Sequence, residues 1–282
     1  MSATGIAAPE ALLSARLTVR YPGKTPVLNG IALDIGAGEV VGLVGQSGSG
    51  KSTLAMALMG LLGGKRATIE GSILFQGTDL LPLAEREWRS LRGRSISLVL
   101  QSPLSALNPA LRIQTQLREA WRAHAAGGDA EPAIESAMKS VSLPSTPEFL
   151  RKYPSQLSVG QAQRVLIAMA VLHRPALLIA DEATSALDVI TQAEVLELFA
   201  RLSRENGMSI LYISHDLPSV AGICQRLAIL HEGQIVESGP AARIFASPEH
   251  PYTRRLMNAL PRMPESGHSR AEAASAGTAV RS

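Results

Sequence analysis

The chain has 282 residues, of which 46% are hydrophobic and 18% charged, and its formal net charge is +3. This length suits one or two domains with a packed core, and the dispersed Lys and Arg residues give little support for a nucleic-acid surface. The single cysteine, Cys224, excludes an intrachain disulfide and any metal site built from several cysteines of this chain, so we expect it to be a small core residue.

The N-terminus, from Met1 to Leu13, has no basic n-region and carries Glu10 in its apolar part, so it lacks the pattern of a signal peptide. No uninterrupted apolar run approaches the roughly 18 residues that a membrane-spanning helix needs. We therefore expect any membrane role to come through a partner.

Strands are predicted at 16–20, 31–35 and 40–44, and the third runs directly into a glycine-rich loop with the pattern G-x-x-x-x-G-K-[ST]. In such a loop, backbone N–H groups wrap a phosphate chain, Lys51 reaches the β- and γ-phosphates, and the Ser52 hydroxyl ligates Mg²⁺. A predicted helix at 52–62 adds a helix N-terminus, which favours anions. The predicted phosphate site comprises Gly45, Gln46, Ser47, Gly48, Ser49, Gly50, Lys51, Ser52 and Thr53.

Tyr21 lies at a turn after the first strand. Without the loop it would be explained as an aromatic half-buried on the sheet, whereas beside a nucleotide site it suits stacking on a purine. Both interpretations stay open from the residues alone.

A strand at 69–75 and a polar helical stretch at 79–93 precede an apolar strand at 96–100, which ends in Gln101. A polar amide at the carboxyl end of such a strand is well placed to meet a ligand, although an ordinary strand-end residue is the simpler explanation. Between 102 and 156, six prolines and two helical stretches, 113–126 and 133–141, indicate a helical insertion without strands. The segment around Trp121 and Arg122 is interpreted as a solvated helix face.

The next helix is predicted at 162–173, with a buried stripe at 165, 166, 169 and 172. Ser158 and Gly160 open it, which makes either an anion-ready N-terminus or simply a capped helix.

An apolar strand at 177–180 runs into Asp181 and Glu182, and adjacent acids at a buried strand end are costly without a partner. With a nucleotide and Mg²⁺, Asp181 would hold the metal through water and Glu182 would polarise an attacking water. A helix with apolar positions 195, 198, 199 and 202 ends near Gly207, and a strand at 209–213 delivers His215. A hairpin follows at 227–237, and the last residues, 265–282, are expected to be disordered.

The ordered segments GQSGSGKST, Gln101, LSVGQ, LLIADE, SALD and ISHD resemble the ATP-binding cassette (ABC) ATPases over nearly the whole span from Leu12 to about Arg255. This resemblance implies an α/β fold, with a P-loop NTPase core on a mostly parallel sheet, an N-terminal antiparallel β part and an α-helical subdomain inserted at about 102–160. It places the ATPase domain at 12–250 and a partly disordered C-terminal tail at 251–282.

The resemblance also implies roles for single residues. Tyr21 is similar to the aromatic that stacks on adenine, and Gln101 to the glutamine that touches Mg²⁺ or the attacking water. Asp181 and Glu182 resemble the metal-binding aspartate and the catalytic base, and His215 resembles the switch histidine near the γ-phosphate.

A second group of residues resembles the family's contacts between subunits. Ser158, Gly160 and Gln161 match the signature that contacts the γ-phosphate of ATP bound to the opposite subunit, and Asp188 resembles an inter-subunit residue. The chain departs from the pattern at Val159, where glycine is common, which adds a Cβ near the facing nucleotide. Ala183 also replaces a frequent proline.

Two segments, 103–109 and 247–253, look like the ATPase subunits of bacterial peptide and nickel importers. The C-terminal cysteine cluster of some peptide importers is missing, which slightly favours the nickel-like members. The resemblance implies ATP and Mg²⁺ as cofactors and a place at the cytoplasmic face of the inner membrane. The implied partners are permease subunits, a second ABC ATPase and, indirectly, an extracytoplasmic solute-binding protein, with no nucleic acid.

The leading hypothesis is an importer subunit in which two cassettes close around two ATP molecules and take up peptides or nickel and other metal chelates. A soluble ABC ATPase acting on DNA, on ribosomes or in phosphonate breakdown is the alternative. One cassette and no long heptad run disfavour the first two, and a phosphonate-pathway component stays open. An inactive partner cassette is disfavoured because every catalytic position is filled.

Overall fold

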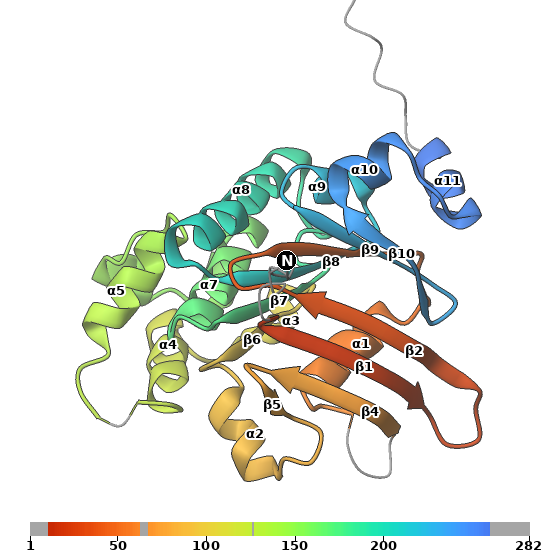
Figure 1. The fold of residues 1–282 in the computed structure, drawn as a ribbon. Helices are drawn as coiled ribbons and strands as arrows, with labels where there is room; N and C mark the ends of the chain where they lie inside the picture. The colour runs from red at the N-terminus through yellow and green to blue at the C-terminus, as the bar shows by residue number, and fades with distance from the viewer. Residues whose placement is uncertain (1–10, 63–66, 126, 260–282) are drawn as a thin grey trace, which may run out of the picture.

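The computed structural model describes residues 11–62, 67–125 and 127–259, and Figure 1 shows two sheets with helices around them. The smaller sheet is antiparallel and has the strand order β2-β1-β4-β5. Along β1 the side chains alternate between buried and more exposed, as expected for a strand with one face on a core. Its strands are β1 (Leu13–Arg20), β2 (Pro26–Ile35), β4 (Thr68–Phe75) and β5 (Thr78–Asp79). The predicted N-terminal antiparallel part is therefore confirmed.

The larger sheet has six strands in the order β10-β9-β3-β8-β7-β6. All neighbouring pairs are parallel except β9 and β10, which form the predicted hairpin. The predicted strand at 40–44 is confirmed to the residue. The strands are β3 (Val40–Val44), β6 (Ile96–Val99), β7 (Leu177–Asp181), β8 (Ser209–Ser214), β9 (Arg226–His231) and β10 (Gln234–Pro240).

Both faces of the parallel sheet are covered. In β3, Val41 and Leu43 face the core shared with the antiparallel sheet, whereas Val40 and Val44 face the core shared with the helices. Helix α1 (Lys51–Leu58) contacts both β2 and β7, so it lies between the two sheets. A strand that is buried on both faces reads as a continuous apolar run, which is why these strands were recognisable from the sequence.

The helical insertion lies to one side of the parallel sheet (Figure 1). Within its described residues no strand occurs, as predicted. Apolar side chains of α4 and α5, among them Leu117 and Met138, join the same core as α7. The helices of this part are α3 (Pro103–Ala106), α4 (Ile113–Arg122), α5 (Glu131–Ser140), α6 (Pro147–Leu150), the 3-10 turn η2 (Pro154–Gln156) and α7 (Val159–Val171).

The remaining helices connect or flank strands. Helix α8 ends at Gly207, whose φ of 64° is the left-handed conformation that glycine adopts without strain, and its predicted buried positions 195, 198, 199 and 202 are confirmed. In the described part of the chain no helix is both long and apolar enough to cross a membrane. The helices are α2 (Glu85–Leu91), α8 (Val189–Asn206), α9 (Leu217–Ala221), α10 (Ala241–Ala246) and α11 (Pro251–Asn258).

Several sequence-based expectations need correction. The helix expected at 79–93 is limited to α2, because the Asp79 carboxylate accepts hydrogen bonds from the amides of Ile73 and Leu81 and so holds a turn. The stripe on α7 is also wrong in part, since Leu166 and Met169 are only half-buried. Cys224 is buried as expected, and its burial raises the pKa of the thiol to about 12.

Two further differences concern aromatic residues. Trp121 does not belong to a solvated face, because its ring stacks on His173 with the centroids 4.9 Å apart and is half-buried. The segment after residue 250 begins with α11, in which Tyr252 is buried, so an ordered helix occupies the start of the expected tail. The disorder predicted for 265–282 lies outside the described residues.

Candidate functional site

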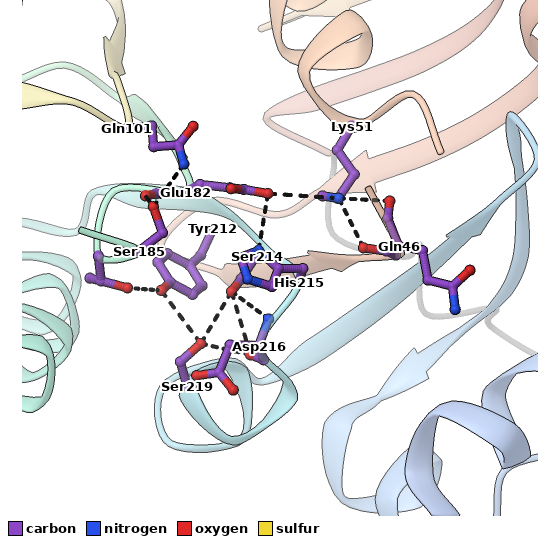
Figure 2. Close-up of polar contacts among 12 residues, drawn as sticks. Gln46, Lys51, Gln101, Glu182, Ser185, Tyr212, Ser214, His215, Asp216 and Ser219 are labelled. Carbon is purple, nitrogen blue, oxygen red and sulfur yellow. Dashed lines mark hydrogen bonds and ion pairs between the residues drawn. The ribbon is translucent and has the colours of Figure 1, made fainter. Parts of the chain in front are cut away.

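The carboxyl ends of three neighbouring parallel strands bring the candidate residues together. The register pairs Val44 of β3 with Ser214 of β8, and Asp181 of β7 with Ile213 of β8. The loop after β3, the acids at the end of β7 and the His215 segment after β8 therefore meet at one edge of the sheet, and Figure 2 shows Lys51, Glu182 and His215 there. This edge is where open α/β sheets bind ligands.

The glycine-rich loop is shaped by the space around it. A Cβ atom on Gly45 would lie 2.2 Å from the carbonyl oxygen of Leu230, so no other residue fits there. Gly50 has a φ of 107°, a backbone conformation that residues with side chains rarely adopt. The loop and the first turn of α1 line a hollow of about 190 Å³ whose lining consists of Val27, Ser47, Gly48, Gly50, Lys51, Ser52, Thr53 and Glu182.

Lys51 lies back across the loop and is only 5% exposed. Its Nζ donates hydrogen bonds to the carbonyl oxygens of Gly45, at 2.8 Å, and Gln46, at 3.0 Å, and lies 3.8 Å from Oε1 of Glu182. Burial lowers the pKa of Lys51, while the carboxylates of Glu182 and Asp181 oppose that shift. The ammonium therefore lines the hollow and is bound to two carbonyl oxygens. An anion bound in the hollow would replace these oxygens as partners of the ammonium.

Asp181 has the environment of a cation ligand. Burial raises its pKa, and the neighbouring Glu182 adds to that effect, whereas a hydrogen bond from Ser52 and the charge of Lys51 oppose it. Its Oδ1 is buried without a hydrogen-bond partner. A buried carboxylate oxygen next to a serine hydroxyl is the oxygen-only donor set that Mg²⁺ prefers, so the residues present fit such an ion.

Glu182 combines backbone strain with two charged neighbours. Its φ of 49° places a non-glycine residue in the left-handed region, which costs of the order of 1–3 kcal/mol and is found where a site demands it. Nδ1 of His215 lies 3.2 Å from the same Oε1 that faces Lys51 (Figure 2). Glu182 also lines a second hollow of about 300 Å³ together with Ser185 and His215. One carboxylate oxygen thus stands between the phosphate loop and the histidine.

Gln101 is tied to this centre through a residue that the sequence analysis did not single out. Its Nε2 donates to Oγ of Ser185 at 3.0 Å, and that hydroxyl donates to the backbone carbonyl of Glu182 at 3.0 Å. Figure 2 shows this chain of contacts beside the carboxylate. Ser185 stands in the SALD segment, but no spacing rule connects it to Gln101, which is 84 residues away.

The signature segment does not join the hollow. Ser158 caps α7, because its Oγ accepts from the amide of Gln161 while Oε1 of Gln161 accepts from the amide of Ser158, each at 3.2 Å. A Cβ atom on Gly160 would lie 2.5 Å from the side chain of Thr191, which explains the glycine by packing against α8. Val159 is 38% exposed. None of the residues that line the loop hollow comes from 158–161.

Asp188 fixes the start of α8 beside this segment. Its carboxylate accepts from the amides of Ile190 and Thr191 and from the Thr191 hydroxyl. The hydrogen bonds from Thr191 hold the pKa of Asp188 below its ordinary value. The next two side chains, Val189 and Ile190, are 83% and 74% exposed, so an apolar pair stands in solvent next to the signature segment.

Two tyrosines differ in their relation to the loop. Tyr21 is half-buried against the core of the antiparallel sheet and does not line the loop hollow, so its stacking on adenine stays a prediction. Tyr252 of α11 was recognised only as part of a segment resembling the importers, yet its hydroxyl accepts a hydrogen bond from the amide of Gln46 at 3.1 Å. No local sequence signal connects these two positions.

Comparison with family models matches residues 28–185 to the family described as ABC transporter, which covers the phosphate loop, the signature and both acids. The chain belongs to the ABC transporter family. A second match, to the oligopeptide/dipeptide transporter C-terminal region, covers residues 236–280.

Known members of the ABC family agree with this assignment. The chain is 43% identical over 255 residues to the oligopeptide transport ATP-binding protein OppD of Salmonella typhimurium, covering 89% of this chain and 76% of that protein. It is 40% identical to the dipeptide transport ATP-binding protein DppD of Bacillus subtilis, covering 88% and 75%.

Solved ABC structures have the same fold. The chain is 27% identical to cbiO1 of Clostridium perfringens, with a TM-score of 0.73 and coverage of 89% and 96%. It is 26% identical to the ATP-binding cassette MJ0796, solved as a dimer bound to ADP and Pi, with a TM-score of 0.70 and coverage of 81% and 98%. The fold predicted for this ABC ATPase, a P-loop core with an antiparallel β part and a helical insertion, is thereby confirmed.

Proposed function

We propose that this ABC ATPase is the ATP-hydrolysing subunit of a bacterial importer of peptides. One observation carries the hydrolytic part of the proposal: the carboxylate of Glu182 is held at the phosphate loop between Lys51 and His215. The relatives OppD and DppD are named for oligopeptide and dipeptide transport, and residues 236–280 match the C-terminal region of such transporters.

The loop residues would bind the triphosphate of ATP. Backbone amides of 45–53 and the N-terminus of α1 would donate to phosphate oxygens, and Lys51 would exchange its two carbonyl partners for the β- and γ-phosphates. Ser52, Asp181 and Gln101 would hold Mg²⁺, which, when bound, neutralises the charge that develops on the phosphates. Tyr21 would stack on the adenine.

Glu182 would act as the general base. Its carboxylate would accept the proton of the attacking water, and the hydrogen-bonded His215 would hold that carboxylate in place and stand near the γ-phosphate. The hydrogen bond from Gln101 to Ser185, and from Ser185 to the backbone of Glu182, would transmit movement of the Gln101 segment to the base.

A second ABC ATPase would complete each site. Ser158, Gly160 and Gln161 do not line this chain's own loop hollow, which supports their contacting ATP on the opposite subunit. ATP contacts made only in the dimer would drive closure, and the helical insertion would pass the movement to permease subunits at the cytoplasmic face of the membrane. A solute-binding protein outside the cytoplasm would deliver the cargo. Uptake of nickel chelates stays a prediction from the sequence segments alone.

The variant Glu182→Gln tests the base. It keeps the size and strained backbone of the residue but cannot accept the proton, so we expect ATP binding to persist while hydrolysis falls about 10²- to 10⁴-fold. A closed dimer should accumulate with ATP, measured by light scattering during gel filtration. Glu205→Gln, on the exposed end of α8, is the matched control and should behave as wild type.

Normal turnover in Glu182→Gln would remove Glu182 as the base. Expression with the neighbouring permease subunits separates the importer from the soluble alternative. Co-purification with those subunits supports the importer, and a chain that instead acts without them on a phosphonate substrate contradicts it.

A further inference from the structure

The segment before and within α11 reaches the phosphate loop from the far end of the chain. The amide of Gln46 donates to the Tyr252 hydroxyl at 3.1 Å across 206 positions of sequence. Tyr252 is 3% exposed and the contact is partly buried, so the amide has the hydroxyl as its partner at a place where the access of solvent is limited.

The contact involves a peptide unit that also holds the lysine. The N–H of Gln46 and the carbonyl of Gly45 belong to the same peptide bond, and that carbonyl accepts from Lys51 Nζ at 2.8 Å. Because a peptide bond is planar and trans, its N–H and C=O point in opposite directions and turn together. Fixing the amide with Tyr252 therefore fixes the carbonyl that faces the lysine.

The ring and backbone of Tyr252, and the segment just before it, are held by residues of the β9–β10 hairpin and by His250. The His231 ring stacks on the Tyr252 ring, with centroids 3.7 Å apart and planes 14° apart. Nδ1 of His250 accepts from the amide of Tyr252 at 3.2 Å. The buried Glu237 carboxylate accepts from the amides of Glu249 and His250, at 2.9 and 3.0 Å. The ring thus has little freedom to move away from the loop.

We propose that Tyr252 is a positioning residue of the nucleotide site, which presets the Gly45–Gln46 peptide and through it the place of Lys51. The inference rests on the proposed function, since it gives the C-terminal segment a part in ATP binding. A loop whose peptide is already oriented loses less conformational entropy when it closes on phosphates. The affinity for ATP then depends on the docking of α11, whereas the chemistry at Glu182 does not.

Tyr252→Phe removes the hydroxyl and keeps the ring that stacks on His231. In the protein without nucleotide, exchange of the Gln46 amide measured by NMR should become faster. The KM for ATP should rise about 2- to 10-fold, the equivalent of one hydrogen bond, while kcat at saturating ATP stays within about twofold. Tyr153→Phe, at an exposed tyrosine in the helical insertion, is the matched control and should change neither quantity.

A solely structural role for Tyr252 predicts a different pattern, in which the melting temperature falls and the exchange of Gln46 and the KM for ATP stay at their wild-type values. That pattern, or an unchanged variant, overturns the proposal. If wild type binds no ATP, the proposed function fails, and the Gln46 exchange still decides the role of Tyr252.

The variant His250→Ala tests the proposal if Tyr252→Phe does not fold. His250→Ala keeps the hydroxyl but removes the cap at the N-terminus of α11. It should accelerate Gln46 exchange and raise the KM for ATP by a smaller factor than the Phe variant. Unchanged exchange and unchanged KM in a folded His250→Ala protein contradict the proposal.

Discussion

The phosphate loop and the signature segment both lie at helix N-termini of the same chain, but their polar groups have different partners. At the loop, Lys51 is buried and faces the carboxylate of Glu182, and Gln46 is fixed by a distant tyrosine. At the signature, the Ser158 hydroxyl accepts a hydrogen bond from the first turn of its own helix. The apolar side chains near it, Val159, Val189 and Ile190, are exposed.

The difference indicates which of the two regions needs a second protein to complete its contacts. The loop has its charges and its oriented peptide within one chain, so under the proposed function a single subunit suffices to bind a nucleotide. The signature has a polar helix start surrounded by apolar side chains in solvent, a surface that becomes favourable when another protein covers it. Under the proposed function, that cover is the nucleotide-bearing face of the second subunit.

The largest effect is expected from removing the charge of the loop. Lys51→Ala should weaken ATP binding about 100-fold or more, since charge-assisted hydrogen bonds to phosphate are worth about 1.5–3 kcal/mol each. Calorimetry with ATP and Mg²⁺ measures the affinity. Lys139→Ala, an exposed lysine of α5, is the control. Unchanged affinity in the Lys51 variant would contradict the role of the loop.

An intermediate effect is expected at the signature. Ser158→Asn keeps a side chain that caps helices as well as serine does, but places a bulkier group where the partner's nucleotide would lie. Hydrolysis should fall about 10-fold, while the affinity of a single subunit for ATP stays unchanged. Steady-state ATPase assays and calorimetry on the same preparation test this. An equal loss of ATP affinity would instead place Ser158 in its own chain's site, and the contrast between the two regions would disappear.

An effect no larger than that at the signature is expected from the exposed apolar pair. The double variant with Val189→Ser and Ile190→Ser should fold normally, because both side chains stand in solvent. In the Glu182→Gln background it should weaken the ATP-bound dimer about 10-fold, because each buried Å² of apolar surface contributes about 25 cal/mol. Sedimentation velocity over a concentration series measures the association. An unchanged dimer would show that this pair lies outside the interface.

Much of the fold could be predicted from the sequence, because a strand that is buried on both faces appears as a continuous apolar run. The apolar runs at 40–44, 177–180 and 209–213 each predict a strand, and a candidate ligand residue follows each run. The helix at 79–93 was overestimated because Asp79 makes side-chain bonds to backbone amides that propensity does not reveal. Trp121 was misjudged because its partner, His173, lies in the turn after α7, far along the sequence.

The finer parts of the candidate site were beyond prediction for a related reason. The contacts of Ser185 with Gln101 and of Tyr252 with Gln46 join residues far apart in sequence, and their distances depend on how whole elements pack. The left-handed backbone of Glu182 could not be predicted either, because a glutamate in a sequence does not indicate a positive φ. Motifs indicate which residue types take part, whereas the packed structure decides which of them touch.

The strand order of the parallel sheet has a consequence for synthesis on the ribosome. Among the described strands, β3 pairs with β8 and β9, and Ile210, the partner of Val40, follows it 170 positions later in the sequence. At a synthesis rate of about 5–20 residues per second, that delay is roughly 9 to 34 seconds. During this time the apolar strand β3 has no neighbouring strand to pair with. Pairings between such distant segments are also slow to form. The strand that leads into the glycine-rich loop is therefore synthesised long before either of the strands that flank it in the sheet.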